Sequence, residues 1–475
     1  MSIIPSFSNC QIESSINSVL FRPYRITEGL TNYLDLLVDL DQTLNDRGLR
    51  AVVRVIEDMD IRFKASSYRK ANYFTKGKYP RRIMTGLGEL SFEREYYVDK
   101  RTGSDGFFYV DEVFGLPRRD YYDPYFKSLI VALCAEHSYG QSGEIAGASI
   151  GTRFKAFRFA AWRNISRQTV RNILKAAEPP DPIIAALANT PETIYVQMDE
   201  KFVHSQNQNG AECEIKLAVV YDGIQAVSPS RNVLLNRHVI GSIDGIGPLR
   251  NGLLDYLSRA YDLTKIKHIV LSGDGAVWIK NSSSELKLAP QIRPLLVLDR
   301  FHTFQAVHRM TTDPDLRDVL RDCLLHNRRR EFEKTSLALV ALDPEREEAI
   351  RGQMDYLLAN WQSIQNQRSP LFKGCSMEGH ISHFAAALFT ARPKAHSLAM
   401  IAKRLAWRLL RINGSDIQRL YLEDHSKLVP SDRYFFDSSH APRSVLDSTD
   451  HRISYIYQIL KASGEIHFAS SRDSY

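Results

Sequence analysis

The chain has 475 residues, of which 44% are hydrophobic and 25% are charged, which is typical of a globular protein with several domains. Its 62 lysines and arginines outnumber its 55 acidic residues and give a formal net charge of +7, which excludes a highly acidic or disordered chain. The five cysteines form no CxxC pair, so we expect neither a zinc ribbon nor a disulfide scaffold. Neither a secretory signal nor an apolar run long enough to span a bilayer is evident, so we expect a cytoplasmic protein with no membrane partner.

Residues 1–84 are predicted to form a helical and basic N-terminal region. Apolar residues such as Leu36, Leu37 and Leu40 recur at helical spacing. No acidic residue occurs from 61 to 88, where basic side chains alternate with aromatic ones: Arg62, Lys64, Tyr68, Arg69, Lys70, Tyr73, Phe74, Lys76, Lys78, Tyr79, Arg81 and Arg82. Such a cluster suits contact with phosphates and bases, and a solvated basic face is the alternative.

Residues 85–122 are predicted to form a small β element. Over residues 86–98, Leu90, Phe92 and Arg94 alternate with polar neighbours, which predicts a strand. A turn at 103–106 precedes a second predicted strand at 107–110. We interpret this element as a platform for the helices that follow.

Residues 123–180 predict a helix-turn-helix DNA-binding module. We expect helices over 123–139, 142–150 and 164–174, the last one capped by Ser166. A second acid-free window runs from 145 to 177. A helix whose first turn presents Arg and Gln is typical of DNA recognition, whereas a generic helical hairpin is the alternative. The candidate DNA-binding residues are Arg153, Lys155, Arg158, Arg163, Arg167, Gln168, Arg171 and Lys175.

A run of strand patterns follows the proline-rich segment 179–182. Strands are expected at 193–199, 214–221 and 231–240, followed by an amphipathic helix at 249–261. Two apolar runs, 268–273 and 294–298, are typical of strands buried on both faces of a sheet. Asp199 ends the first strand, whereas Asp274 and Asp299 directly follow the last two.

This order of strands and helices resembles the ribonuclease-H-like fold, in which the first and fourth strands are parallel neighbours. Asp199 and Asp274 would then stand side by side, and a cation such as Mg²⁺ would offset their repulsion. The best third carboxylate is Glu378, at the start of a predicted helix that contains Ile381 and Phe384. Three carboxylates complete a two-metal site for attack on a phosphodiester. The alternative for Glu378 is a side chain stabilised by the helix dipole.

The fold class predicted for the chain is therefore α/β, with a mixed ribonuclease-H-like sheet flanked by helices. The core is divided into residues 190–310 and 373–415, because the intervening segment 311–372 is helical by period and forms an all-helical insertion. Residues 416–475 form a C-terminal region to which we assign no role.

Several motifs occur in an order and spacing that point to one family. They are Gly86-Leu87-Gly88-Glu89, Phe114-Gly115-Leu116-Pro117, Ile165-Ser166-Arg167-Gln168-Thr169-Val170, Met198-Asp199-Glu200, Gly273-Asp274-Gly275-Ala276-Val277-Trp278-Ile279, Leu298-Asp299-Arg300-Phe301-His302 and Cys375-Ser376-Met377-Glu378-Gly379-His380. From about residue 86 to 408 the chain resembles the transposases of bacterial insertion sequences of the ISLre type, long catalogued as an uncharacterised protein family. These are relatives of the mutator-like DDE transposases.

The resemblance implies a DDE triad of Asp199, Asp274 and Glu378 that binds two Mg²⁺ or Mn²⁺ ions. Asp299 and His302 match a DxxH element near the active site, where His302 would orient a phosphate, a flipped base or the leaving group. A helix-capping pair is the alternative. The implied substrates are double-stranded transposon ends and target DNA, and synapsis of two ends implies a homodimer or higher oligomer.

Other residues near these motifs have weaker claims to a role. Glu200 is expected to point to the face of the strand opposite Asp199, and Trp278 is expected in the core rather than stacked on a base. Zinc binding by Cys375, His380 and His383 lacks a fourth ligand at matching spacing. A basic set either binds DNA or forms a solvated face: Arg392, Lys394, Lys403, Arg404, Arg408 and Arg411. The rival functions are a ribonuclease-H-like nuclease that only hydrolyses DNA and a non-catalytic DNA-binding regulator.

Overall fold

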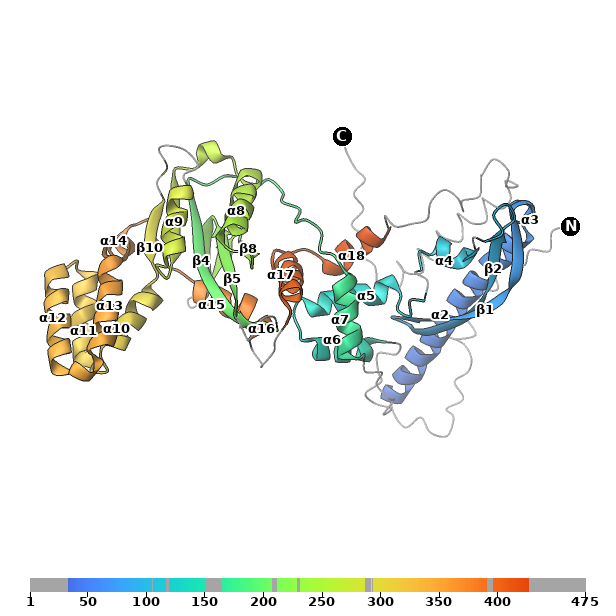
Figure 1. The fold of residues 1–475 in the computed structure, drawn as a ribbon, viewed down its shortest axis with the longest axis horizontal. Coiled ribbons are helices and arrows are strands. Elements are labelled where there is room, and N and C mark those ends of the chain that lie inside the picture. The colour runs from blue at the N-terminus through green and yellow to red at the C-terminus, as the bar shows by residue number, and fades with distance from the viewer. Residues whose placement is uncertain are drawn as a thin grey trace. The chain divides into compact units, whose positions relative to one another are not determined.

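The computed structural model describes residues 33–104, 106–116, 119–150, 165–206, 212–228, 231–286, 292, 294–390 and 396–426. The chain divides into two units (Figure 1). The first unit contains residues 1–124, 150–160 and 424–475, and the second contains residues 125–149 and 161–423. Each helix in the described ranges is too short or too polar to cross a lipid bilayer.

The first unit has a long helix beside an antiparallel sheet with the order β1-β2-β3. Its elements are α2 (Tyr33–Ala65), α3 (Ser67–Asn72), β1 (Tyr73–Thr85), β2 (Gly88–Asp99), β3 (Gly106–Phe108) and α4 (Tyr109–Val113). The predicted strand at 86–98 is confirmed as β2. The predicted strand at 107–110 is wrong in its second half, because Tyr109 and Val110 begin a helix. Strand β1 was not predicted.

Some basic residues of the first acid-free window, 61–88, form ion pairs within this unit. The Lys64 ammonium pairs with Glu95 at 2.7 Å, and Lys78 lies 3.9 Å from Glu93. Asp60 accepts a hydrogen bond from the Tyr97 hydroxyl, and burial raises the pKa of this carboxyl. Lys64 and Asp60 therefore join α2 to β2, whereas the Lys78 pair lies on the exposed surface of the sheet.

The second unit contains a mixed five-stranded sheet with the order β10-β9-β4-β5-β8. Strands β9 and β10 run parallel to β4, whereas β5 and β8 are antiparallel to their neighbours. The strands are β4 (Thr193–His204), β5 (Glu212–Tyr221), β8 (His238–Ser242), β9 (His268–Gly273) and β10 (Leu295–Leu298).

The single strand predicted at 231–240 is wrong. The chain forms a separate hairpin from β6 (Gly223–Ser228) and β7 (Arg231–Leu235), and only then enters the main sheet as β8. The break falls at Asn236, whose φ of 48° lies in the left-handed region and ends an extended run.

Helices cover both faces of this sheet, as predicted for the fold class. On one face, α8 (Ile246–Ala260) and α9 (Val277–Glu285) pack against Ile194, Val196 and Met198 of β4. On the other face, apolar residues of β5 contact a second layer. That layer contains α15 (Met377–Ile381), the π-helical turn η5 (Ser382–Ala386), α16 (Ala387–Phe389) and α17 (Leu398–Ile412).

The segment predicted as an all-helical insertion is helical and has its own core around Leu320, Phe332 and Leu357. With the preceding helix it comprises α10 (Arg300–Met310), α11 (Pro314–Leu325), α12 (Arg329–Leu342), η3 (Pro344–Arg346), α13 (Glu347–Ala359), α14 (Trp361–Gln365) and η4 (Asn366–Arg368). The Asn366 and Gln367 amides donate to carbonyls of β10 and so fix the insertion to the edge of the sheet.

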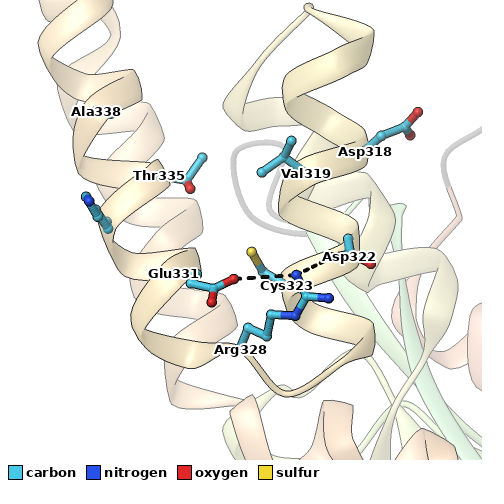
Figure 2. A pocket seen from close by; sticks show the side chains of 9 residues that line it. Asp318, Val319, Asp322, Cys323, Arg328, Glu331, Thr335 and Ala338 are labelled. Carbon is cyan, nitrogen blue, oxygen red and sulfur yellow. Dashed lines mark ion pairs between the residues drawn. The ribbon is translucent and has the colours of Figure 1, made fainter.

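A shallow polar depression lies between α11 and α12 (Figure 2). Within it, the Arg328 guanidinium lies 2.9 Å from Asp322 and 3.5 Å from Glu331. Arg328 thus pairs with two of the acidic residues that line this depression, and none of the lining residues belongs to the predicted catalytic set.

The predicted helical module forms α5 (Pro124–Cys134), α6 (Tyr139–Ser149) and α7 (Arg167–Ala176), and α18 (Ile417–Ser426) ends the described chain. The Ser166 cap is confirmed, because its hydroxyl accepts from the Thr169 N–H at 3.1 Å. Gly143 lets α6 approach α7 closely, since a Cβ there would lie 2.1 Å from the Ile165 carbonyl oxygen.

The basic side chains of α17 make hydrogen bonds and ion pairs within the second unit. The Arg404 guanidinium donates to carbonyls at the end of α5, and Arg408 donates to Ala135 and His383 carbonyls. The Lys403 and Arg411 side chains pair with Glu178 and Glu136. These four residues hold the helical module, whereas residues 392 and 394 lie outside the described part of the chain.

Candidate active site

Three aspartates lie near one level of the sheet, where the parallel pairing of neighbouring strands ends. The strand predicted at 193–199 continues to His204, so Asp199 lies within β4, whereas Asp274 and Asp299 follow β9 and β10. Strands β4 and β9 pair up to Gln197 and Ser272, and Asp199 and Asp274 each lie two residues further along. Asp299 directly follows the last paired residue of β10. Because the carboxyl ends of parallel strands share an edge of the sheet, this edge collects the acidic side chains.

Asp199, Glu200 and Asp274 form a compact acidic cluster. One carboxylate oxygen from each lies within 4.8 Å of the others. Asp199 is only 8% exposed, so its charge is largely removed from water. Three carboxylates this close repel one another, and a hard divalent cation is the partner that their oxygens suit. The cluster could therefore hold a metal ion.

The loop that carries Asp274 is rigidly held. The Asp274 carboxylate accepts from the Ala276 N–H at 2.9 Å, and the Tyr356 hydroxyl of α13 donates to the Asp274 carbonyl at 2.5 Å. Gly275 has a φ of 83°, and a Cβ there would lie 2.6 Å from the Asn360 side-chain oxygen. The helical insertion thus contacts and supports the loop that carries Asp274.

Glu200 lies closer to the site than its position on the strand predicted. The Glu200 side chain points from β4 toward α9, where the Trp278 indole N–H donates to its Oε2 at 2.6 Å. A carboxylate oxygen of Glu200 nevertheless lies within 4.8 Å of oxygens of Asp199 and Asp274. Burial and the Asp274 charge raise the pKa of Glu200. Trp278 packs beside the core, as expected, and its N–H serves this carboxylate. The adjacent Asp-Glu pair at the strand end was the signal available in the sequence.

Glu378 lies in α15, whose start is fixed to the sheet. The Ser376 N–H and hydroxyl both donate to Gln197 Oε1, at 3.1 and 3.3 Å, and the Gln197 amide donates to the Tyr221 hydroxyl. Gln197 precedes Asp199 by two residues and therefore shares its face of β4. The backbone of Glu378 thus passes over the face that bears Asp199, while its side chain lies outside the described part of the chain.

Asp299 and His302 are neighbours at the start of α10. The Asp299 carboxylate caps the helix by accepting from the Phe301 N–H at 3.2 Å, and His302 Nδ1 lies 3.8 Å from Asp299 Oδ2. Burial raises the pKa of Asp299, and the Cys375 thiol donates a hydrogen bond to it. Asp299 is therefore the N-cap of α10, with His302 beside it in the first turn. Among the described residues, Asp299 is not part of the cluster formed by Asp199, Glu200 and Asp274.

Cys375, His380 and His383 form no metal-ligand group within the described ranges. Burial and the nearby Asp299 charge raise the pKa of the Cys375 thiol.

The predicted DNA-binding residues divide between described and undescribed parts of the chain. Arg153, Lys155, Arg158 and Arg163 lie outside the described residues. The other four are on α7: Arg167, Gln168 and Lys175 are exposed, and Arg171 is half-buried. The Gln168 amide donates to Asn172 at 2.8 Å, so α7 presents an ordered polar face opposite its buried Val170, Ile173 and Leu174.

The fold and the acidic cluster define a mixed α/β protein with a candidate site for a divalent cation. The model of the Uncharacterised protein family (UPF0236) matches residues 25–425, and the chain belongs to this family.

Relatives of similar length support this assignment. A UPF0236 protein of Caldanaerobacter subterraneus subsp. tengcongensis is 26% identical over 398 residues, which cover 82% of this chain and 80% of the relative. Another from the same organism is 25% identical over 396 residues, with the same coverage, and its name contains eleven gene designations. The UPF0236 protein in the vanSb 3′ region of Streptococcus gallolyticus is 24% identical over 301 residues, or 60% of this chain and 61% of the relative.

Proposed function

We propose that the chain is a DDE transposase with a ribonuclease-H-like catalytic core. The observation that carries the proposal is the acidic cluster, in which Asp199 and Asp274 each lie two residues beyond the last pair of the parallel strands β4 and β9. The sheet order β10-β9-β4-β5-β8, with β5 antiparallel to β4, agrees with the topology that this class of enzyme requires.

Asp199, Asp274 and Glu378 would hold the metal ions in this proposal. Asp199 and Asp274 already present oxygens to one another, and α15 brings the backbone of Glu378 over the same face. Two bound Mg²⁺ or Mn²⁺ ions would supply Lewis acidity for hydrolysis of the transposon end and for attack of its 3′-hydroxyl on target DNA. Asp299 and His302, which lie beside the cluster, would orient a phosphate or the leaving group.

The basic residues would bind the DNA. In the proposal, α5, α6 and α7 form a helix-turn-helix module that places Arg167, Gln168, Arg171 and Lys175 on the terminal inverted repeats. The exposed polar face of α7 supports this role, because a recognition helix must present such residues in a groove. A homodimer or higher oligomer would bring two ends together in the cytoplasm, at the nucleoid.

The name of one relative gives independent support. A single protein whose name contains eleven gene designations is the pattern that a repeated gene produces, and a mobile element repeats its own gene.

The test is cleavage and joining of a DNA that carries the element's ends, with Mg²⁺ and the purified chain. The proposal expects nicking and strand transfer, with both lost in Asp199→Asn and Glu378→Gln but kept in Asp255→Asn. Asp255 is a matched control because its carboxylate is exposed and pairs with Arg259 on α8. Nicked products without joined products would favour the hydrolytic nuclease. Binding that EDTA leaves unchanged, with no nicking, would favour the regulator.

A further inference from the structure

Glu200 occupies an unusual position for a metal ligand. It is adjacent to Asp199 on β4, and successive side chains of a strand point to opposite faces. Asp199 shares its face with Gln197 and α15, whereas Glu200 points toward α9. A side chain on that face needs an added interaction to keep its carboxylate beside those of Asp199 and Asp274.

Trp278 supplies such an interaction. Its indole N–H donates to Glu200 Oε2 at 2.6 Å, and an indole has no other hydrogen-bonding atom. Trp278 stands in the first turn of α9, four residues after Asp274, so the bond joins the strand that bears two of the carboxylates to the segment that bears the third. One oxygen of Glu200 serves the indole, and a carboxylate has a second oxygen for a cation.

Lys216 completes the surroundings of this bond. It is paired with Glu200 across β4 and β5, and its Nζ lies 4.4 Å from the centroid of the Trp278 ring. Its own ion pair is with Glu214. The ammonium therefore contacts the face of the ring, while the indole N–H sets the direction of the Glu200 carboxylate.

We propose that Trp278 is a positioning residue of the metal site, whose indole N–H holds Glu200 as a ligand beside Asp199 and Asp274. This rests on the metal-binding part of the proposed function and not on any step with DNA. Removal of a group that hydrogen-bonds a metal ligand and orients it typically weakens metal affinity about 10- to 100-fold.

The experiment measures Mn²⁺ affinity of the full chain by titration calorimetry, without DNA. Trp278→Phe keeps the ring contact and removes the N–H, and we expect about tenfold weaker Mn²⁺ binding. Trp361→Phe is the matched control, because Trp361 also donates its indole N–H to a side-chain oxygen, that of Asn327 at 2.7 Å in the insertion. We expect Mn²⁺ affinity to be unchanged in this control.

Two further variants separate positioning from a general loss of structure. In Trp278→His the Nε2–H of the five-membered ring takes the place of the indole N–H, and we expect part of the lost affinity to return. In the Glu200→Gln background, Trp278→Phe should weaken binding no further, because both changes remove the same ligand. Wild-type affinity in Trp278→Phe, or full additivity with Glu200→Gln, would overturn the proposal. Undiminished Mn²⁺ binding in Asp199→Asn would instead refute the metal site itself.

Discussion

Replacing Arg404 with methionine removes the central contact between α17 and the helical module. This guanidinium is fully buried and donates to the Cys134 and His137 carbonyls at 3.3 and 2.7 Å. It also lies 3.0 Å from His396 Nε2 and over the Tyr139 ring. Cys134 is the last residue of α5 and His137 lies just beyond it, where backbone carbonyls lack an intrahelical donor.

The expected cost follows from these contacts. Each buried carbonyl left without a donor costs about 1–3 kcal/mol, and relief of the buried charge offsets part of this sum. We therefore expect Arg404→Met to lower the free energy of unfolding by about 3 kcal/mol. At roughly 2–4 °C per kcal/mol for a unit of this size, the melting temperature should fall by about 6–12 °C.

Thermal and urea unfolding followed by circular dichroism would measure this loss. Arg411→Met is the control, because Arg411 is half exposed and its ion pair with Glu136 should contribute less than about 1 kcal/mol. If the two variants unfolded alike, or if Arg404→Met matched the wild type, the assignment of Arg404 as the clamp of α5 would be wrong.

Two further predictions concern packing and pH. Gly143→Ala should separate α6 from α7 and lower the free energy of unfolding in urea by more than about 2 kcal/mol, because its Cβ would lie 2.1 Å from the Ile165 carbonyl oxygen. The control is Gly352→Ala, at an open helical position, which should be neutral or stabilising by up to about 1 kcal/mol. Equal effects would refute the close approach. Burial lowers the pKa of His238 to about 4, below its ordinary value of 6.5. Between these two pH values the unfolded chain binds more protons than the folded chain, so the free energy of unfolding falls as the pH drops from 6.5 to about 4. His238→Phe, which keeps the stacking on Tyr256, should make urea midpoints less dependent on pH, and an unchanged dependence would contradict this assignment.

The elements with a clear hydrophobic period were predicted well. Strands β9 and β10 were found as continuous apolar runs, and α8 was found from the spacing of Leu249, Leu253 and Leu257. Strand β1 was missed because it lies at the edge of its sheet, where charged residues such as Lys76 and Lys78 replace the apolar alternation. The hairpin before β8 was missed because one left-handed residue, Asn236, decides the break.

The candidate site was predicted only in part for similar physical reasons. Asp199 and Asp274 were found because each comes after an apolar strand pattern in the sequence and the parallel strands align them, although β4 continues past Asp199 to His204. Glu200 was missed because alternation along a strand describes the backbone, whereas its carboxylate is turned by a hydrogen bond from Trp278. Arg404 was read as a surface cation, since no local pattern shows that two helix-end carbonyls from a distant segment receive it.

Strand cleavage on DNA that carries the element's own ends tests the central claim most directly. With Mg²⁺ the purified chain should nick the ends and join the freed 3′-hydroxyl to target DNA, and EDTA should abolish both products. Asp199→Asn and Asp274→Asn should bind the DNA normally and yield neither product. Full activity in either variant, with the fold intact, would contradict the assignment of the acidic cluster as the catalytic centre.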